Sequence, residues 1–248
     1  MEVIKIITKK TKFKMLLEVL CLVCLLFMIV YFAKADPSSG TTISSNVTDN
    51  GRIYTPANRT DSGGTITTFS VDAQQQDTRW KAYVGNVTGS LTLDDSDGMT
   101  IYNWTVGLAD ITGEVYSSRA SSVSWSLIRC ASTTTVASEQ TTLGMNSSSA
   151  DTITKTFNET THPEFVTAGE TISSGCNATA TYVNDAREDQ SSATFPLVLL
   201  DDETNLIYTA IINRNSTGFD NSNYDFQMIV ANDPTSTTTY YFYVELGN

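Results

Sequence analysis

The sequence predicts an all-β fold, an antiparallel β-sandwich of the immunoglobulin-like or jelly-roll-like kind with at most one short helix. Two observations favour it. From residue 65 onward, short runs of β-branched and aromatic residues are separated about every ten residues by clusters of Asp, Asn, Ser and Gly. Hydrophobic residues make up 40% of the 248 residues, which is enough to build a packed core.

The N-terminus has the pattern of an export signal, a hydrophobic helix that precedes the β domain. Lysines dominate the charge before Met15, an apolar run follows, and the motif Ala33-Lys34-Ala35 has the small-x-small form of a cleavage site. We expect cleavage after Ala35, and the alternative is a retained membrane anchor. Residues 19–33 are uncharged and would span about 22 Å as a helix, less than the roughly 30 Å of a bilayer core, which favours the signal.

The chain is predicted to have three parts. Residues 1–35 form the signal or anchor, residues 36–64 an extended arm rich in Ser, Thr, Gly and Asn, and residues 65–248 the β domain. Residues 36–248 carry nine basic and 25 acidic side chains, a net charge of −16. Such a surface repels phosphate groups, so nucleic acid is excluded as a partner and membrane contact is expected only through the N-terminal segment.

Two hairpins are the clearest elements of the β domain. The first covers residues 90–102 around the acidic turn 94–98, and the second covers residues 197–208 around the turn 201–205. Both contain Leu-Asp-Asp, a short turn and then Ile-Tyr. This likeness reflects either an internal duplication or the same hairpin chemistry used twice.

Two further strands are expected at residues 224–231 and 238–246. The second is apolar on both faces, as central or covered strands are. One face holds Tyr240, Phe242, Val244 and Leu246, and the other holds Tyr241 and Tyr243.

One helix is expected near residues 120–131, where Val123, Leu127 and Ala131 have helical spacing. Val123, Trp125 and Leu127 fit a strand as well, so both interpretations remain open. Residues 107–113 and 143–156 are expected to be loops.

The cysteines and sequons indicate an extracellular protein. Cys130 and Cys176 are the only cysteines beyond the signal, and two cysteines in an exported chain most simply form one disulfide. Eight Asn-x-Ser/Thr sequons predict N-linked glycans, although a chain rich in Ser, Thr and Asn also produces sequons by chance. The sequons lie at Asn46, Asn58, Asn86, Asn103, Asn146, Asn158, Asn177 and Asn215. Strand alternation should point Asn103 away from Tyr102 and Trp104.

No catalytic constellation is evident, so no enzymatic activity is expected. His162 is the only histidine, and no Gly-x-Ser-x-Gly motif accompanies it. No cofactor is expected either. Asp94, Asp95 and Asp97, followed by Gly98, are a weak candidate for a Ca²⁺ site, and the alternative is an acidic, solvated turn.

The aromatic residues have two interpretations. They either fill the core and cross-strand pairs of the sandwich or line a sugar-binding platform. The residues concerned are Trp80, Tyr83, Tyr102, Trp104, Trp125, Tyr240, Tyr241 and Tyr243.

Three segments carry a resemblance. They are residues 80–89 (WKAYVGNVTG), 224–230 (YDFQMIV) and 240–246 (YYFYVEL). Over residues 78–248 the chain resembles an uncharacterised family of secreted archaeal β-rich cell-surface proteins. The resemblance implies an archaeal cell surface, where exported proteins carry N-linked glycans, and it implies no particular activity.

Together these features predict a non-catalytic, exported glycoprotein that is a structural component of the cell surface. Its partners would be further copies of itself or other surface proteins. One version is a subunit of an extracellular filament in which the arm, residues 36–64, adds a β-strand to the sheet edge of a neighbour. The alternative is a carbohydrate- or ligand-binding adhesion module, and a hydrolase is disfavoured.

Overall fold

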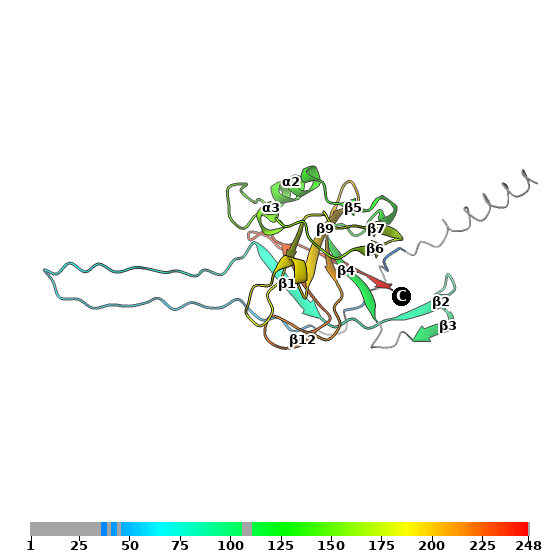
Figure 1. Ribbon diagram of the computed structural model, residues 1–248, viewed down its shortest axis with the longest axis horizontal. Coiled ribbons are helices and arrows are strands. Elements are labelled where there is room, and N and C mark those ends of the chain that lie inside the picture. Colours follow the sequence, from blue (N-terminus) through cyan, green and yellow to red (C-terminus); the bar gives the residue numbers. More distant parts are fainter. Residues whose placement is uncertain (1–35, 39–40, 44–45, 106–110, 248) are drawn as a thin grey trace, which may run out of the picture.

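The computed structural model describes residues 36–38, 41–43, 46–105 and 111–247 of the chain (Figure 1). The fold is mostly β, with 33% strand and 10% helix, and its sheets are antiparallel. The β-rich part of the prediction is therefore confirmed. The signal or anchor predicted for residues 1–35 lies outside the described residues.

A six-stranded antiparallel sheet forms the centre of the domain. In spatial order its strands are β14 (Tyr241–Gly247), β4 (Thr112–Ser118), β10 (Leu206–Ile211), β9 (Pro196–Asp201) and β5 (Arg129–Cys130), and β8 (Ala178–Ala180) also pairs with β9. Strands β9 and β10 are the second predicted hairpin, paired from Leu206↔Asp201 to Ala210↔Leu197. Strand β4 is not evident from the sequence, although it lies between β14 and β10.

This sheet has a hydrophobic core on each face because successive strand residues point to opposite sides. On β9, Leu197 and Leu199 enter one core, whereas Val198 and Leu200 enter the other. All four side chains are almost completely buried, which places β9 at the centre of both cores.

Different elements cover the two faces. The first core is closed by the pair β1 (Trp80–Gly85) and β13 (Phe226–Ala231), by α2 (Thr133–Thr142) and by α3 (Ile153–Thr156). The second is closed by the 3₁₀ helix η2 (Trp125–Leu127) with its flanking residues, and by the hairpin of β6 (Phe165–Thr167) and β7 (Glu170–Ile172). The remaining elements are β2 (Ser90–Asp94), β3 (Thr100–Thr105), η3 (Gln190–Ser192), β11 (Ser216–Thr217) and β12 (Asn223–Tyr224).

The helix prediction was wrong in position. Residues 120–131 contain the short η2 and strand β5, and the longer helix α2 starts after Ser132. The Ser132 hydroxyl caps α2 by accepting a hydrogen bond from Thr135 N at 3.1 Å, and Asp201 accepts from Ser132 N at 2.8 Å. The buried Asp201 carboxylate, 69 residues away in sequence, thus fixes the start of the helix.

The prediction of at most one short helix was also wrong, because a second α-helix, α3, lies within the loop predicted for residues 143–156. Its first turn is capped by Thr152, whose hydroxyl accepts from Lys155 N at 3.3 Å. In the other predicted loop, residues 107–113, β4 begins at Thr112, and residues 106–110 lie outside the described parts.

Strand β14 has the two apolar faces that its sequence predicts. Phe242, Val244 and Leu246 contact the first core, whereas Tyr243 is buried in the second. The strand lies at one side of the six-stranded sheet, next to β4. On its outer side Ser38 of the arm forms an antiparallel bridge with Val244.

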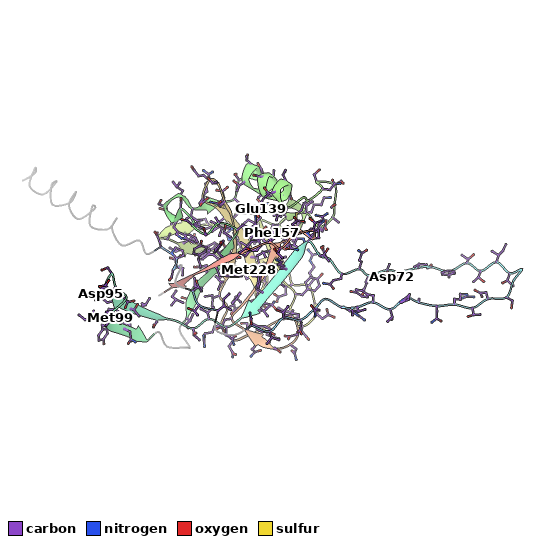
Figure 2. The ribbon with its side chains drawn as sticks, turned by 180° about the vertical axis from the view of Figure 1, so that it is seen from behind. Asp72, Asp95, Met99, Glu139, Phe157 and Met228 are labelled. Carbon is purple, nitrogen blue, oxygen red and sulfur yellow. A yellow bond between two sulfur atoms is a disulfide. The ribbon has the colours of Figure 1, made fainter. Side chains whose placement is uncertain are left out.

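Two parts of the chain extend away from this compact body, at opposite ends of the long axis (Figure 1). Residues 46–78, which we call the excursion, run out from the domain and return without forming a helix or strand. The hairpin of β2 and β3 projects at the other end. Figure 2 shows Asp72 on the excursion, and Asp95 and Met99 at the turn of the hairpin.

Candidate interaction surfaces

The β2–β3 hairpin exposes one apolar face. Its register pairs Leu91 with Trp104 and Leu93 with Tyr102, so these four side chains lie on the same side. The Tyr102 and Trp104 rings contact each other edge to face with centroids 4.9 Å apart. Each of the four side chains is between 40% and 59% exposed. Because other residues of the described chain leave this face uncovered, it is the first candidate interaction surface.

The reverse face of the hairpin is polar. Thr92 pairs with Asn103, and both alternate with the apolar residues along their strands. The Asn103 sequon therefore points away from Tyr102 and Trp104, as the sequence predicts. A glycan on Asn103 would leave the apolar face free.

The hairpin turn uses its acidic residues for local structure. Asp95 Oδ1 accepts from Asp97 N at 3.0 Å and from Met99 N at 2.8 Å, and Gly98 has a φ of +79°. Within the described ranges, no three His, Cys, Asp or Glu side chains gather to hold a metal ion. The proposed Ca²⁺ ligands Asp94, Asp95 and Asp97 are exposed at the tip of this turn.

The excursion is the second candidate interaction surface. Each residue from 46 to 78 is exposed. The chain reverses at Gly63-Gly64, where Gly64 has a φ of +83°, and the two legs approach each other where Gly51 faces Gln76. The legs do not form a ladder of backbone hydrogen bonds. Unstructured connections of this length are uncommon in compact domains and usually have a function of their own or are disordered.

Residues 65–71 are the part of the excursion best suited to form a strand. Their sequence, TITTFSV, consists of β-branched, aromatic and small residues without charge or proline. Ile66, Phe69 and Val71 are between 64% and 100% exposed. No backbone-to-backbone hydrogen bond involves these seven residues among the described parts of the chain. The segment is thus an unpaired strand candidate with apolar side chains in solvent.

The arm begins along the edge of β14. Ser38 and Val244 exchange backbone hydrogen bonds of 2.9 and 3.3 Å, and the Thr41 hydroxyl donates to the Phe242 carbonyl at 2.9 Å. Pro37 is buried beside this contact. The first residues after the predicted cleavage site therefore cover part of a sheet edge within the same chain.

Cys130 and Cys176 form the predicted disulfide. Their Cα atoms are 4.9 Å apart across a sequence separation of 46 residues. The bridge joins β5, at one side of the central sheet, to the segment that leads into β8. It thus connects two short strands that both pair with β9.

His162 lies beside this disulfide. Its Nε2 accepts a hydrogen bond from Cys176 N at 3.2 Å, and its Nδ1 lies 2.8 Å from the Pro163 carbonyl oxygen, to which it donates. The ring is buried and contacts Phe165 edge to face. Both ring nitrogens are therefore engaged in positioning the loop around Cys176.

The sequons differ in accessibility. Asn177 is half-buried, and its side-chain nitrogen donates to the Phe157 carbonyl at 2.9 Å. The other seven asparagines are exposed, at Asn46, Asn58, Asn86, Asn103, Asn146, Asn158 and Asn215.

The two Leu-Asp-Asp turns differ in burial. Asp201 and Asp202 are buried, whereas Asp94 and Asp95 of the other turn are exposed. Asp201 accepts from Arg129 Nε at 2.9 Å as well as from Ser132 N, and Asp202 accepts from Ser124 N at 3.0 Å. Burial alone would raise their pKa values, but these hydrogen bonds hold the pKa of each carboxyl below its ordinary value. The two carboxylates thereby fix the position of residues 124–132, which include the η2 helix that covers the second core.

Most aromatic residues considered for a sugar platform belong to the cores. Trp125 and Tyr243 are buried and contact each other at 5.4 Å, and the Trp80 indole nitrogen donates to the Asp151 carbonyl. Tyr102 and Trp104 are exposed but not coplanar, at an interplanar angle of 61°. Together they present one ring face and one edge.

Two shallow hollows lie beside Arg119, which forms a two-point ion pair with Glu139 at 2.7 and 2.6 Å. Their volumes are about 170 and 260 Å³, and their walls are mainly Ser and Thr side chains. Small-molecule sites usually enclose about 300–1,000 Å³ and have apolar walls. These hollows therefore provide little enclosure for a ligand.

Comparison with known proteins found no matching family model, curated protein or solved structure. In the described part of the chain, no helix has the length and apolar character needed to cross a bilayer.

Proposed function

We propose that this chain is a non-catalytic, exported glycoprotein with a β-sandwich domain, and that it is a structural subunit of an extracellular filament assembled by β-strand addition. The observation that carries the proposal is the excursion, which presents a long stretch of exposed backbone without a partner strand. Strand-forming segments of this kind are free to pair with another chain.

The remaining parts of the proposal have separate support. The disulfide between Cys130 and Cys176 and the seven exposed sequons are compatible with the extracellular surface. The resemblance to secreted archaeal proteins favours an archaeal cell surface. Engagement of both His162 nitrogens favours a structural role for the one histidine. The β1–β13 pair, packed against one face of the central sheet, is the second layer of the sandwich in this proposal.

Electron microscopy of the purified mature protein tests this function. We expect the intact chain to form filaments at neutral pH, and a variant that lacks residues 46–78 to remain a single particle. Immunogold labelling of intact cells should locate the same filaments at the surface. Monodisperse particles from the intact chain, together with label spread through the medium, would contradict the proposal.

A carbohydrate-binding module is the second candidate, favoured by the exposed ring pair Tyr102 and Trp104. Titration of the protein with oligosaccharides, with tryptophan fluorescence as the readout, separates the two functions. Saturable binding that is lost in Trp104→Ala, by a protein that does not assemble, would favour the module.

A further inference from the structure

We propose that residues 65–71 of one copy add as a third strand to a free edge of the β2–β3 hairpin of the next copy, so that Phe69 and Val71 extend its apolar face. This inference rests on the proposed function and names the two surfaces that would join successive subunits.

The hairpin is incomplete as a β structure. In the described residues β2 pairs only with β3, and the apolar side chains of Leu91, Leu93, Tyr102 and Trp104 remain exposed. An isolated pair of strands is at best marginally stable in water, whereas three strands with a shared apolar face can be stable. A third strand would also satisfy the free backbone groups of one hairpin edge.

Residues 65–71 have the length and pattern that this edge requires. Seven extended residues span about 23 Å, enough to cover the five and six residues of β2 and β3. Phe69 and Val71 are two positions apart and therefore share a side in a strand, while Ser70 faces the reverse side. Aromatic and β-branched side chains on neighbouring strands form favourable lateral pairs, so Phe69 and Val71 suit the face that carries Tyr102 and Trp104.

The excursion is acidic overall but carries two arginines. The hairpin turn carries Asp94, Asp95 and Asp97, and the rest of the chain is mostly acidic. The outgoing leg of the excursion holds Arg52 and Arg59, and Arg59 is already paired with Asp61 at 2.7 Å. Arg52 is therefore the basic side chain of the excursion that can lie near the acidic hairpin turn of a neighbour.

The positions of the two elements favour a chain of subunits over a closed pair. The excursion and the hairpin lie at opposite ends of the molecule (Figures 1 and 2). Pairing therefore joins two different surfaces on different copies, and the resulting pair keeps one free surface of each kind. A head-to-tail contact of this type propagates unless rotation closes a ring.

Paired variants of the intact chain test the inference. Phe69→Asp with Val71→Asp disrupts the apolar side of the added strand, which we call the donor face. Leu93→Asp with Trp104→Asp disrupts the apolar face of the hairpin, which we call the acceptor face. Thr68→Asp with Ser70→Asp, and Ser90→Asp with Thr92→Asp, put the same charge on the reverse sides and are the matched controls. All these positions are exposed, so circular dichroism and thermal unfolding should match the unmodified protein.

We expect each face variant alone to remain a monomer and both controls to assemble. A mixture of the donor and acceptor variants should form pairs that stop at two copies, because only one intact junction can form. As a measurement independent of variant folding, a peptide of residues 64–73 should shorten filaments of the unmodified protein, and a scrambled peptide should not.

The outcomes separate this inference from the function on which it rests. If the unmodified protein does not assemble, both the filament function and the junction are wrong. If it assembles and the face variants assemble equally well, or if their mixture yields no pairs, the filament remains and the proposed junction is overturned. An ineffective peptide would likewise contradict the junction.

Discussion

Glu114 of β4 lies directly opposite Glu245 of β14, and the Tyr116 hydroxyl bridges their carboxyl groups at 3.4 and 2.9 Å. Burial raises the pKa of Glu245, and the backbone N–H of Ala168, which donates to its carboxylate at 3.0 Å, limits that rise. Burial, reinforced by the charge of Glu245, raises the pKa of Glu114 to about 8. The pair therefore holds a proton on Glu114 at neutral pH, which removes the repulsion between two buried carboxylates.

This pair should make the domain less stable as the pH rises. The pKa of Glu114 is 4.5 in an unperturbed chain and about 8 in the folded protein, so the folded state binds more protons between these values. The free energy of unfolding should decrease through this interval by about 5 kcal/mol and level off above it. Urea unfolding at several pH values measures the slope. Glu114→Gln should flatten the slope, whereas the exposed control Glu159→Gln should not; an unchanged slope in Glu114→Gln would refute the assignment.

Removal of the disulfide should destabilise the domain strongly. Cys130 and Cys176 close a loop across 46 residues, for which the chain-entropy relation gives about 4 kcal/mol. We expect Cys130→Ser with Cys176→Ser to unfold at a markedly lower urea concentration. A reducing agent should lower the midpoint of the unmodified protein to a similar value and leave that of the double variant unchanged. Equal midpoints for the oxidised protein and the double variant would show that the bridge contributes little.

Asp201 and Asp95 should respond differently to the same substitution. Asp201→Asn leaves a buried site short of acceptors for Arg129 and Ser132, so a loss of about 2–4 kcal/mol is expected. Asp95→Asn changes an exposed turn, and a loss below about 1 kcal/mol is expected. Thermal unfolding of both variants gives the comparison. Similar losses would mean that burial of Asp201 does not govern its contribution.

Glycan occupancy should follow side-chain accessibility. The Asn177 nitrogen already donates to the Phe157 carbonyl, and the side chain is half-buried, so we expect this sequon to remain unmodified. Asn158, exposed on the segment just after Phe157, is the matched control and should carry a glycan. Mass spectrometry of peptides from protein isolated from its own cells measures both sites. A glycan at Asn177 would show that modification occurs before this region folds.

The elements predicted correctly are those whose signals are local. The hairpins of β2–β3 and β9–β10 have turn residues flanked by β-branched and apolar residues, and such turns form from contacts within a dozen residues. The faces of β14 follow from the strict alternation of side chains in a strand. The disulfide follows from the presence of only two cysteines after the predicted signal.

The missed elements depend on distant parts of the chain. Strand β4 has only Val115 and Tyr116 as large apolar residues, and it buries Glu114, Ser117 and Ser118 because β10 and β14 flank it. Helix α2 is rich in threonine and has no clear apolar stripe. Its position depends on the Ser132 cap and on the carboxylate of Asp201.

The properties of the candidate interaction surfaces also fall into two groups, those that follow from local sequence and those that depend on the fold. Strand alternation predicts that Asn103 points away from Tyr102 and Trp104, because that relation needs only the geometry of one strand. That this apolar face is uncovered, and that residues 65–71 form no ladder, emerged only from the fold. Exposure is decided by which other segments pack against a residue.

The amino-acid sequence alone thus determined the local properties of this protein: strand periodicity, turn chemistry, the cysteine pair and the acidic charge. Tertiary structure decided which strand is central, which of two Leu-Asp-Asp turns is buried, and which ends of the molecule carry unpaired β surfaces. The physical reason is that periodicity and turn preference arise from a residue and its near neighbours. Burial and pairing instead require partners that only the folded chain brings together.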